Sequence, residues 1–448
     1  MQMWLSEVAE QISAEHIGED AVFSRVSIDT RTINEGDLFV ALTGENFDGH
    51  DYLEKACDSG AVAAMVSRQL KMMLPMLNVK DTRLGLGQLA ALWRSRFNIP
   101  LVAVTGSNGK TTVKDMIASI MTCKGDVLST LGNLNNDIGV PLTLLRLKKH
   151  HHTAVIEMGA NHSGEILYLS GLARPDVAVI TNAAAAHLAG FGSMEGVARA
   201  KGEIYSNLNM NGVAVVNADD AFAPLWKTMA GSRKMILFGL GDDADVTAEW
   251  QQYDDHLQLQ MQTPVGECVV RLELLGRHNI LNALAASASA ISMGADADAV
   301  VRGLENMKPV SGRLQSRPGL KDMRILDDTY NANPASLEAA LDVLSEMSGE
   351  KWLILGDMGE LGEDTAELHA NCGRLVRERG VDRLYTLGEL ARHAAVSFGD
   401  YGVGFQDTHE LVERIRKDWH GQGTLLVKGS RLMHMEQVVT ELSGEAAG

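Results

Sequence analysis

The stretch IPLVAVTGSNGKTTVKDMIASIM, residues 99–121, is the strongest fold signal in this chain. Its apolar run Leu101–Val104 predicts a buried strand, and the pattern after Thr112 predicts a helix. The loop between them is small, polar and rich in glycine. Because backbone N–H groups and a helix N-terminus attract anions, we predict a phosphate-binding loop.

Four residues of this loop have a chemical role in that prediction. Gly106 and Gly109 let N–H groups turn inward, Lys110 can reach outer phosphates, and the Thr111 hydroxyl can bind Mg²⁺. The loop is shorter than the general Walker A pattern. The alternative is a purely structural glycine turn, but Lys-Thr-Thr at the start of a helix fits that alternative poorly. The predicted ATP-binding residues are Gly106, Ser107, Asn108, Gly109, Lys110, Thr111 and Thr112.

Size and composition limit the classes of protein. A chain of 448 residues is long enough for about three domains. Its net charge of −18 argues against nucleic acid as the main partner, and no apolar run approaches the ~18 residues of a membrane span. The N-terminus lacks the features of a signal peptide, and four widely spaced cysteines fit a reducing cytoplasm.

Residues 1–98 form the first predicted domain, a small α/β unit. Expected elements are an opening helix in MQMWLSEVAEQIS, strands in VFSRVSIDTR, GDLFVAL and AVAAMVS, and a helix in RLGLGQLAALWRSRF. Arg31 and nearby N–H groups could hold a diphosphate or a carboxylate. An Asp-Thr-Arg turn that satisfies its own backbone explains the same residues equally well.

Residues 99–309 form the second predicted domain, around the phosphate loop. Apolar runs end at Glu157 and shortly before His187, and parallel strands should bring both side chains to the rim that carries the loop. Both suit Mg²⁺ or charge compensation near phosphates. A strand-end salt bridge for Glu157, and an ordinary loop histidine for His187, remain alternatives.

Other residues of this domain are weaker candidates. Asn133, Asn135 and Asn136 are either turn formers or donors to a polar ligand. Lys201 lies in a predicted helix, where a solvated lysine is the ordinary outcome. HLQLQMQ and ECVVRLEL should pair across a turn, and the helix beginning at GRHN should end at Gly294 and present His278, Asn279 and Asn282 to a base.

Residues 310–448 form the third predicted domain. Strands in RILDD, KWLILG, RLYTL, GVGF and TLLVKG alternate with helices, which predicts a doubly wound, Rossmann-like parallel sheet. Polar residues at the strand ends mark one ligand-facing rim, and Asn333 should cap a helix that has Pro334 in its first turn. The absence of G-x-G-x-x-G argues against a dinucleotide site.

These motifs together resemble the Mur ligase family. The resemblance rests on TGSNGKTT, EMGANHSGEI, AAAAHLAGFGS, ARAKGEI, GRHNILNALAA, SGRLQ and DDTYNANPAS, in the family's order and over nearly the whole chain. DDTYNANP with GDMGELG resembles the branch that adds D-alanyl-D-alanine to UDP-N-acetylmuramoyl-tripeptide. This resemblance implies a cytoplasmic, ATP- and Mg²⁺-dependent ligase with three α/β domains. We expect the protein to be a monomer.

The resemblance also implies roles for particular residues. The UDP end of the acceptor would be held by Ser27, Asp29, Thr30, Arg31, Phe47, Asp48, Gly49 and His50. Adenine and ribose would be held by Asn282, Arg313, Asp328 and Asn331. The metal site would use Thr111, Glu157, His187 and Lys201, the last as a carbamate. The catalytic residues would be Lys110, Glu157, His187 and Lys201. Peptide and dipeptide contacts would come from Asn133, Asn135, Asn136, Asn333, Asp357 and Lys428.

Amide formation from these substrates requires activation, because a carboxylate is a weak electrophile and an ammonium ion is not a nucleophile. Phosphoryl transfer from ATP would give an acyl phosphate, and attack by the dipeptide amine would leave ADP and phosphate. The alternatives are a folylpolyglutamate synthetase, a P-loop kinase and a non-catalytic nucleotide sensor.

Overall fold

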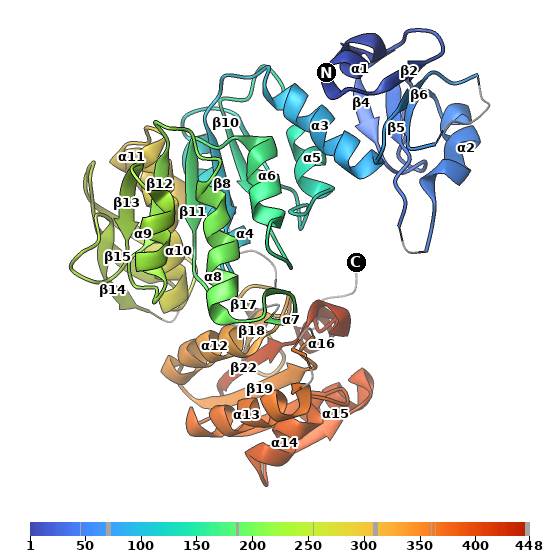
Figure 1. The fold of residues 1–448 in the computed structure, drawn as a ribbon. Coiled ribbons are helices and arrows are strands. Elements are labelled where there is room, and N and C mark those ends of the chain that lie inside the picture. Colours follow the sequence, from blue (N-terminus) through green and yellow to red (C-terminus); the bar gives the residue numbers. More distant parts are fainter. Residues whose placement is uncertain are drawn as a thin grey trace.

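The computed structural model describes residues 1–44, 46–68, 73–184, 188–253, 255–307, 312–359, 361–362 and 364–443. Three α/β lobes follow one another along the chain (Figure 1), as the sequence predicts. The boundary predicted at residues 309 and 310 lies outside the described residues. Among the residues described, no helix combines the length and the apolar character needed to cross a membrane.

The N-terminal lobe is built on a five-stranded sheet in which only the β2–β7 pair is antiparallel. Its order is β2 (Glu15–Ile17), β7 (Met76–Asn78), β6 (Ala61–Val66), β5 (Asp37–Val40) and β4 (Arg25–Ser27). A second small sheet pairs β1 (Met3–Trp4) with β3 (Val22–Phe23). The helices are α1 (Leu5–Ile12), the 3-10 turn η1 (Gly49–Tyr52), α2 (Leu53–Asp58) and α3 (Thr82–Arg94).

Two local predictions for this lobe are wrong. The segment VFSRVSIDTR is not one strand, because the chain leaves β3 at Ser24 and enters a different sheet at β4. The Ser24 N–H donates to the carbonyl of Gly36 at 2.9 Å, which fixes this change of sheet. The opening helix also begins later than predicted, at Leu5, since Met3 and Trp4 pair with β3.

The central lobe contains a six-stranded sheet in which every neighbouring pair is parallel. Its order is β13 (Lys234–Phe238), β12 (Val213–Asn217), β11 (Val177–Ile180), β8 (Leu101–Thr105), β10 (Thr153–Glu157) and β9 (Val127–Ser129). Strand β8 therefore lies between β11 and β10, and the carboxyl ends of these three strands meet at one edge.

Helices cover both faces of the central sheet. They are α4 (Lys110–Thr122), α5 (Gly139–Leu144), α6 (Glu165–Ala173), α7 (Leu188–Phe191), α8 (Met194–Gly202), the 3-10 turn η2 (Glu203–Tyr205), α9 (Ala223–Ala230), α10 (Arg277–Ser292) and α11 (Ala297–Glu305). Strands β14 (Thr247–Gln252), β15 (Leu257–Thr263) and β16 (Gly266–Leu272) form an antiparallel sheet. The β15–β16 pairing confirms the prediction, as does the end of α10 just before Gly294.

The C-terminal lobe contains the predicted doubly wound sheet. Its order is β17 (Gln315–Pro318), β18 (Met323–Asp328), β22 (Gly423–Lys428), β19 (Glu350–Gly356), β20 (Arg383–Leu387) and β21 (Gly402–Phe405). The last five are parallel as predicted, whereas β17 is an antiparallel edge strand that the sequence analysis missed. None of its four residues is buried, so it carries no apolar pattern.

Helices α12 (Pro334–Glu346), α13 (Thr365–Glu378) and α14 (Arg392–Phe398) pack on one face of this sheet, and α15 (Thr408–Asp418) and α16 (Glu436–Ser443) on the other. A short 3-10 turn, η3 (Arg431–Met433), follows β22. Asn333 caps α12 as predicted, and it forms a capping box with Ser336.

Candidate active site

The phosphate loop connects the carboxyl end of β8 with the first residue of α4. Gly106 and Gly109 have φ angles of +148° and +79°, in the region that favours glycine. A Cβ at Gly106 would collide with the Thr181 hydroxyl, and one at Gly109 would collide with the Asn282 side chain. Both glycines are thus required by conformation and by space.

The residues that follow β11 hold this loop in place. The Thr181 hydroxyl donates to the carbonyl of Asn108 at 2.6 Å, and the Asn108 N–H donates to Asn182 Oδ1 at 3.0 Å. The Ser107 hydroxyl exchanges hydrogen bonds with the backbone of Ala184. Sequence reasoning missed these anchors, although their position just after an apolar run is a signal for the same sheet edge.

Lys110 folds back over its own loop. Its Nζ donates to the carbonyl of Gly106 at 2.8 Å and to that of Ser107 at 3.1 Å. Removal from water lowers the pKa of Lys110 below its usual value, and the negative charge of Glu157 opposes that shift. The ammonium group is therefore held at the place where the loop would bind phosphate.

Glu157 ends β10 with a carboxylate that is only 2% exposed. Its Oε1 accepts from Asn135 Nδ2 at 2.8 Å, while Oε2 is buried without a hydrogen-bond partner among the described residues. No ion pair of Glu157 is found within the part of the chain that the structure describes, so the strand-end salt bridge is not observed. An orphaned buried carboxylate oxygen is costly, and a cation would satisfy it.

The rest of the predicted metal site is less complete. Thr111 begins α4 beside the loop, and His187 lies outside the described residues. The described ranges contain no cluster of three or more His, Cys, Asp or Glu side chains suited to a metal ion. The fit to a divalent cation therefore rests on Glu157 and Thr111.

Lys201 is not the solvated helix lysine that was the ordinary alternative. It is 3% exposed in α8, and its Nζ lies 5.4 Å from the centre of the Phe191 ring. Burial, with repulsion from Lys110, lowers the pKa of Lys201 to about 7. A substantial fraction of this amine is therefore uncharged at neutral pH.

A cavity of about 410 Å³, here called the first cavity, joins the loop to α10 and to the C-terminal lobe. Arg313 spans the junction, because its guanidinium lies 4.2 Å from the Tyr330 ring centre and donates to the Thr111 hydroxyl at 3.1 Å. The first cavity brings together the predicted residues Ser107, Asn108, Gly109, Lys110, Thr111, Thr112, Asn282, Arg313, Asp328, Asn331, Asn333 and Lys428.

A second cavity, of about 670 Å³, extends from the loop toward the N-terminal lobe. It includes the predicted residues Gly106, Asn133, Asn135, Asn136 and Lys201. It also includes residues that sequence reasoning missed: Arg83, Asp137, Tyr168 and Glu165. Ser107, Lys110, Asn135 and Asn331 line both cavities, so the phosphate loop stands where the two spaces meet.

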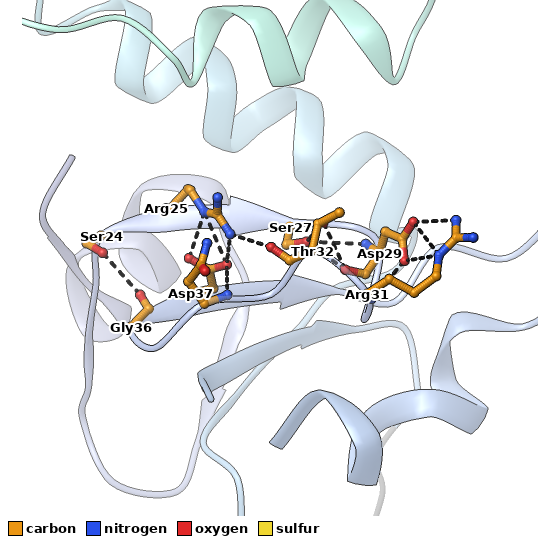
Figure 2. A network of polar contacts seen from close by, with 9 residues as sticks. Ser24, Arg25, Ser27, Asp29, Arg31, Thr32, Gly36 and Asp37 are labelled. Carbon is orange, nitrogen blue, oxygen red and sulfur yellow. Dashed lines mark hydrogen bonds and ion pairs between the residues drawn. The ribbon is translucent and has the colours of Figure 1, made fainter. Parts of the chain in front are cut away.

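The predicted residues at the end of β4 and just after it form a self-contained turn (Figure 2). Arg31 pairs with Asp29 at 2.6 Å, and its backbone N–H donates to the same carboxylate at 2.9 Å. These contacts lower the pKa of Asp29 to about 2. Ser27 bonds to the carbonyl of Asp29 and to Thr32. The alternative interpretation, an Asp-Thr-Arg turn that satisfies its own backbone, is therefore observed. The Arg31 side chain remains 81% exposed.

The Phe47–His50 segment also has a structural role. His50 Nδ1 contacts Asp48 Oδ1 at 2.6 Å, and its Nε2 accepts from the Ser67 N–H at 2.9 Å. A Cβ at Gly49 would lie 2.7 Å from the carbonyl oxygen of Leu42. Thr30 and this segment line neither cavity, and their predicted contact with the UDP group stays a prediction.

Three predicted residues of the C-terminal lobe are engaged within the protein. Lys428 is buried and donates to Asp328 at 2.5 Å and to the carbonyl of Asn331 at 3.0 Å. Asp357 accepts from the Ala391 N–H at 2.7 Å, and Asn333 donates to Asn108 Oδ1 at 3.2 Å. The buried Met435 lies against Gly356, at the end of β19, and Gly429, just after β22.

Comparison with known proteins gives matches over most of the chain. Family models match residues 22–94 (Mur ligase family, catalytic domain), 104–290 (Mur ligase middle domain) and 312–431 (Mur ligase, glutamate ligase domain). The UDP-N-acetylmuramoyl-tripeptide--D-alanyl-D-alanine ligase of Escherichia coli strain K12 is 46% identical over 442 residues, covering 98% of each chain.

Two solved structures are similar over nearly the full length. One is the UDP-N-acetylmuramoylalanyl-D-glutamyl-2,6-diaminopimelate--D-alanyl-D-alanyl ligase of Acinetobacter baumannii, with 36% identity, 99% coverage of both chains and a TM-score of 0.90. The other is the MurF ligase of Thermotoga maritima in complex with ADP, with 28% identity, coverage of 94% and 97%, and a TM-score of 0.84.

Proposed function

This chain belongs to the Mur ligase family, and on that premise we propose that it joins D-alanyl-D-alanine to UDP-N-acetylmuramoyl-tripeptide in peptidoglycan precursor synthesis. ATP is converted to ADP and phosphate in the reaction. The observation that carries this proposal is the position of Ser107 and Lys110 in the wall shared by the two cavities. A nucleotide in the first cavity would present its terminal phosphate to an acceptor carboxylate in the second.

The chain's own groups supply the activation that amide formation needs. An acceptor carboxylate oxygen attacks the terminal phosphorus of ATP, the bond to ADP breaks, and an acyl phosphate forms. The Lys110 ammonium and the loop N–H groups stabilise the charge on the transferred group. The uncharged amine of the dipeptide then attacks the acyl carbon, the bond between that carbon and the phosphate oxygen breaks, and the phosphate leaves with the electron pair. The nitrogen loses one proton, which the phosphate or water accepts, and the amide remains.

Magnesium is part of the proposal. The orphaned Oε2 of Glu157 and the hydroxyl of Thr111 would hold it, with His187 as a further predicted ligand. When bound, the ion would neutralise phosphate charge. Glu157 itself is kept in place by Asn135, which lines both cavities.

Lys201 is proposed to carry a carbamate. Its lowered pKa leaves an uncharged amine that can attack CO₂, with loss of one proton, and the product is an anion beside Lys110. We expect Lys201→Ala to lose most activity and small carboxylates such as formate to restore part of it. Failure of every small carboxylate to restore activity would count against the carbamate.

The remaining assignments are also proposals. The UDP group would contact the exposed side chains Arg31 and Phe47 of the N-terminal lobe, and the dipeptide would approach from the C-terminal lobe. A cytoplasmic location and a monomeric state stay predictions.

A two-substrate assay tests the proposed reaction. Phosphate release from ATP should appear only when the UDP-linked tripeptide and D-alanyl-D-alanine are both present. Oxygen-18 in the terminal carboxylate of the acceptor should appear in the released phosphate, because one acyl oxygen bridges to phosphorus. A stable phosphorylated product would indicate a kinase, and negligible release under every pairing would indicate a sensor.

A further inference from the structure

An ion pair between two lobes lies in the wall of the second cavity. Arg83, near the start of α3 in the N-terminal lobe, contacts Asp137 of the central lobe, with 3.0 Å between Nη1 and Oδ2. The two side chains are 45% and 36% exposed, and both residues line the cavity. Neither residue has a part in the chemistry proposed above.

This ion pair leaves hydrogen-bonding capacity unused. The Arg83 guanidinium carries five N–H donors, and within the described ranges only Nη1 has a hydrogen bond. Asp137 uses Oδ2 in that contact, and its other carboxylate oxygen accepts no side-chain hydrogen bond from the described residues. A ligand that carries both charges could therefore bind to the pair at its open side.

The same cavity offers a surface for a methylene chain. Leu84, Leu169 and the Tyr168 ring line it beside the charged pair. The Tyr168 hydroxyl lies against Gly87 and is buried without a hydrogen-bond partner among the described residues. Burial and the negative charge of Asp137 raise the pKa of Tyr168, which therefore stays an uncharged donor near the pair.

From this arrangement we infer that Arg83 and Asp137 bind the far end of the third acceptor residue and select 2,6-diaminopimelate over lysine. The third residue carries the carboxylate that must reach Lys110, so its side chain has to lie in the second cavity. Diaminopimelate ends in an ammonium and a carboxylate, whereas lysine ends in an ammonium alone. Asp137 receives the ammonium of either residue, and Arg83 receives the carboxylate that only diaminopimelate has.

The inference rests on the proposed function and assigns its acceptor class. The similar ligase of Acinetobacter baumannii is named for a diaminopimelate acceptor. What the geometry adds is the pair of residues that would carry the preference in this chain.

The test compares kcat/KM for two acceptors, the UDP-linked tripeptides that end in diaminopimelate and in lysine, with the full-length enzyme. We expect the wild type to favour diaminopimelate by about tenfold or more, the value of one charge-assisted hydrogen bond. Arg83→Gln should remove this preference by lowering only the diaminopimelate value, and Arg83→Lys should retain part of it. Asp137→Asn should lower both values.

Arg271→Gln is the matched control, because Arg271 pairs with Asp255 at the same 3.0 Å distance and lines neither cavity. It should leave both values unchanged. Equal use of both acceptors by the wild type, or an equal fall for both in Arg83→Gln, would overturn the inference while leaving the ligase reaction standing. Absence of phosphate release with either acceptor would overturn the proposed function instead.

Discussion

Removal from water changes the chemistry of individual side chains around the phosphate loop. Lys110 and Lys201 both have a lowered pKa, and the two lysines have different roles in the proposed reaction. Lys110 retains an opposing carboxylate in Glu157, which favours the charged form that phosphate requires. For Lys201, burial and then repulsion from Lys110 lower the pKa and favour the uncharged form that a carbamate requires, while Glu165 and Glu203 oppose the shift.

Replacing Lys110 tests the loop directly. Lys110→Ala should lower kcat by about a thousandfold, because removing one preorganised group that stabilises charge in the transition state typically lowers kcat by about that factor. The far-ultraviolet circular dichroism spectrum should stay unchanged, since Nζ bonds only to carbonyls of its own loop. The exposed Lys149→Ala is the control, and near-normal turnover of Lys110→Ala would exclude the loop from the mechanism.

His278 gives a prediction about pH. Removal from water and the nearby Lys428 lower its pKa to about 4, while Asp328 opposes the shift. An unfolded histidine titrates near 6.5, so between about pH 4 and 6.5 the unfolded chain binds one more proton. The contribution of neutral His278 to stability is therefore complete above about pH 6.5 and is lost as the pH falls toward 4.

The measurement is the difference in melting temperature between His278→Gln and the wild type. Glutamine cannot gain this proton, so the variant should be relatively more stable at pH 5 than at pH 7.5. Other titrating groups are common to both proteins and cancel in the difference. A difference that does not change between the two pH values would show that His278 titrates normally.

Helix α4 carries the phosphate loop, and its position depends on close packing against α11. A Cβ added at Gly303 of α11 would collide with the backbone of Ile120 and would lie 2.8 Å from its Cγ1. The carbonyl of Gly303 also accepts from the Ser119 hydroxyl at 2.6 Å. The two helices approach closely at Gly303, where a side chain is absent.

Gly303→Ala should therefore destabilise the protein by about 1–3 kcal/mol, the usual range for overpacking. Thermal unfolding followed by circular dichroism would show it as a lower melting temperature. Gly171→Ala in α6 is the matched control, because its Cβ would meet its nearest neighbour at 3.5 Å. It should be neutral or stabilising by about 0.5–1 kcal/mol, and an equal loss in both variants would contradict the packing argument.

The lobes act together because the first cavity has walls from two of them and the second cavity has walls from all three. In the first cavity, Arg313 and Asn333 of the C-terminal lobe contact Thr111 and Asn108 of the phosphate loop. In the second cavity, Arg83 of the N-terminal lobe contacts Asp137. The fit of a substrate in either cavity therefore depends on the relative position of at least two lobes.

Arg313→Ala tests the junction at the first cavity. It removes the contact with Thr111 and the stacking on Tyr330, so the KM for ATP should rise about tenfold or more. The KM for the acceptor should change much less, because Arg313 does not line the second cavity. Arg302→Ala on α11 is the control, and equal changes in both KM values would indicate general disruption.

Local patterns were sufficient for much of this protein. They predicted the strand–loop–helix unit around residues 99–121, the β15–β16 pair and the Asn333 cap, because each depends on neighbours that are close in the chain. Apolar runs also located the strands of the two parallel sheets, although not their order. Strand-end clustering also selected Asp328 and Lys428, which line the first cavity, since strand ends in a parallel sheet gather at one edge. Arg313 and Asn331 of the same cavity were indicated only by the resemblance to the Mur ligase family.

Contacts between distant segments were decided only by the folded chain. Thr181 holds the phosphate loop from 73 residues away, and Arg83 meets Asp137 from 54 residues away. Lys201 is buried although its helical position allowed exposure, and the polar β17 is a strand only because β18 offers it an edge. Burial and partners depend on the order of strands and the docking of lobes, which no short stretch of sequence encodes.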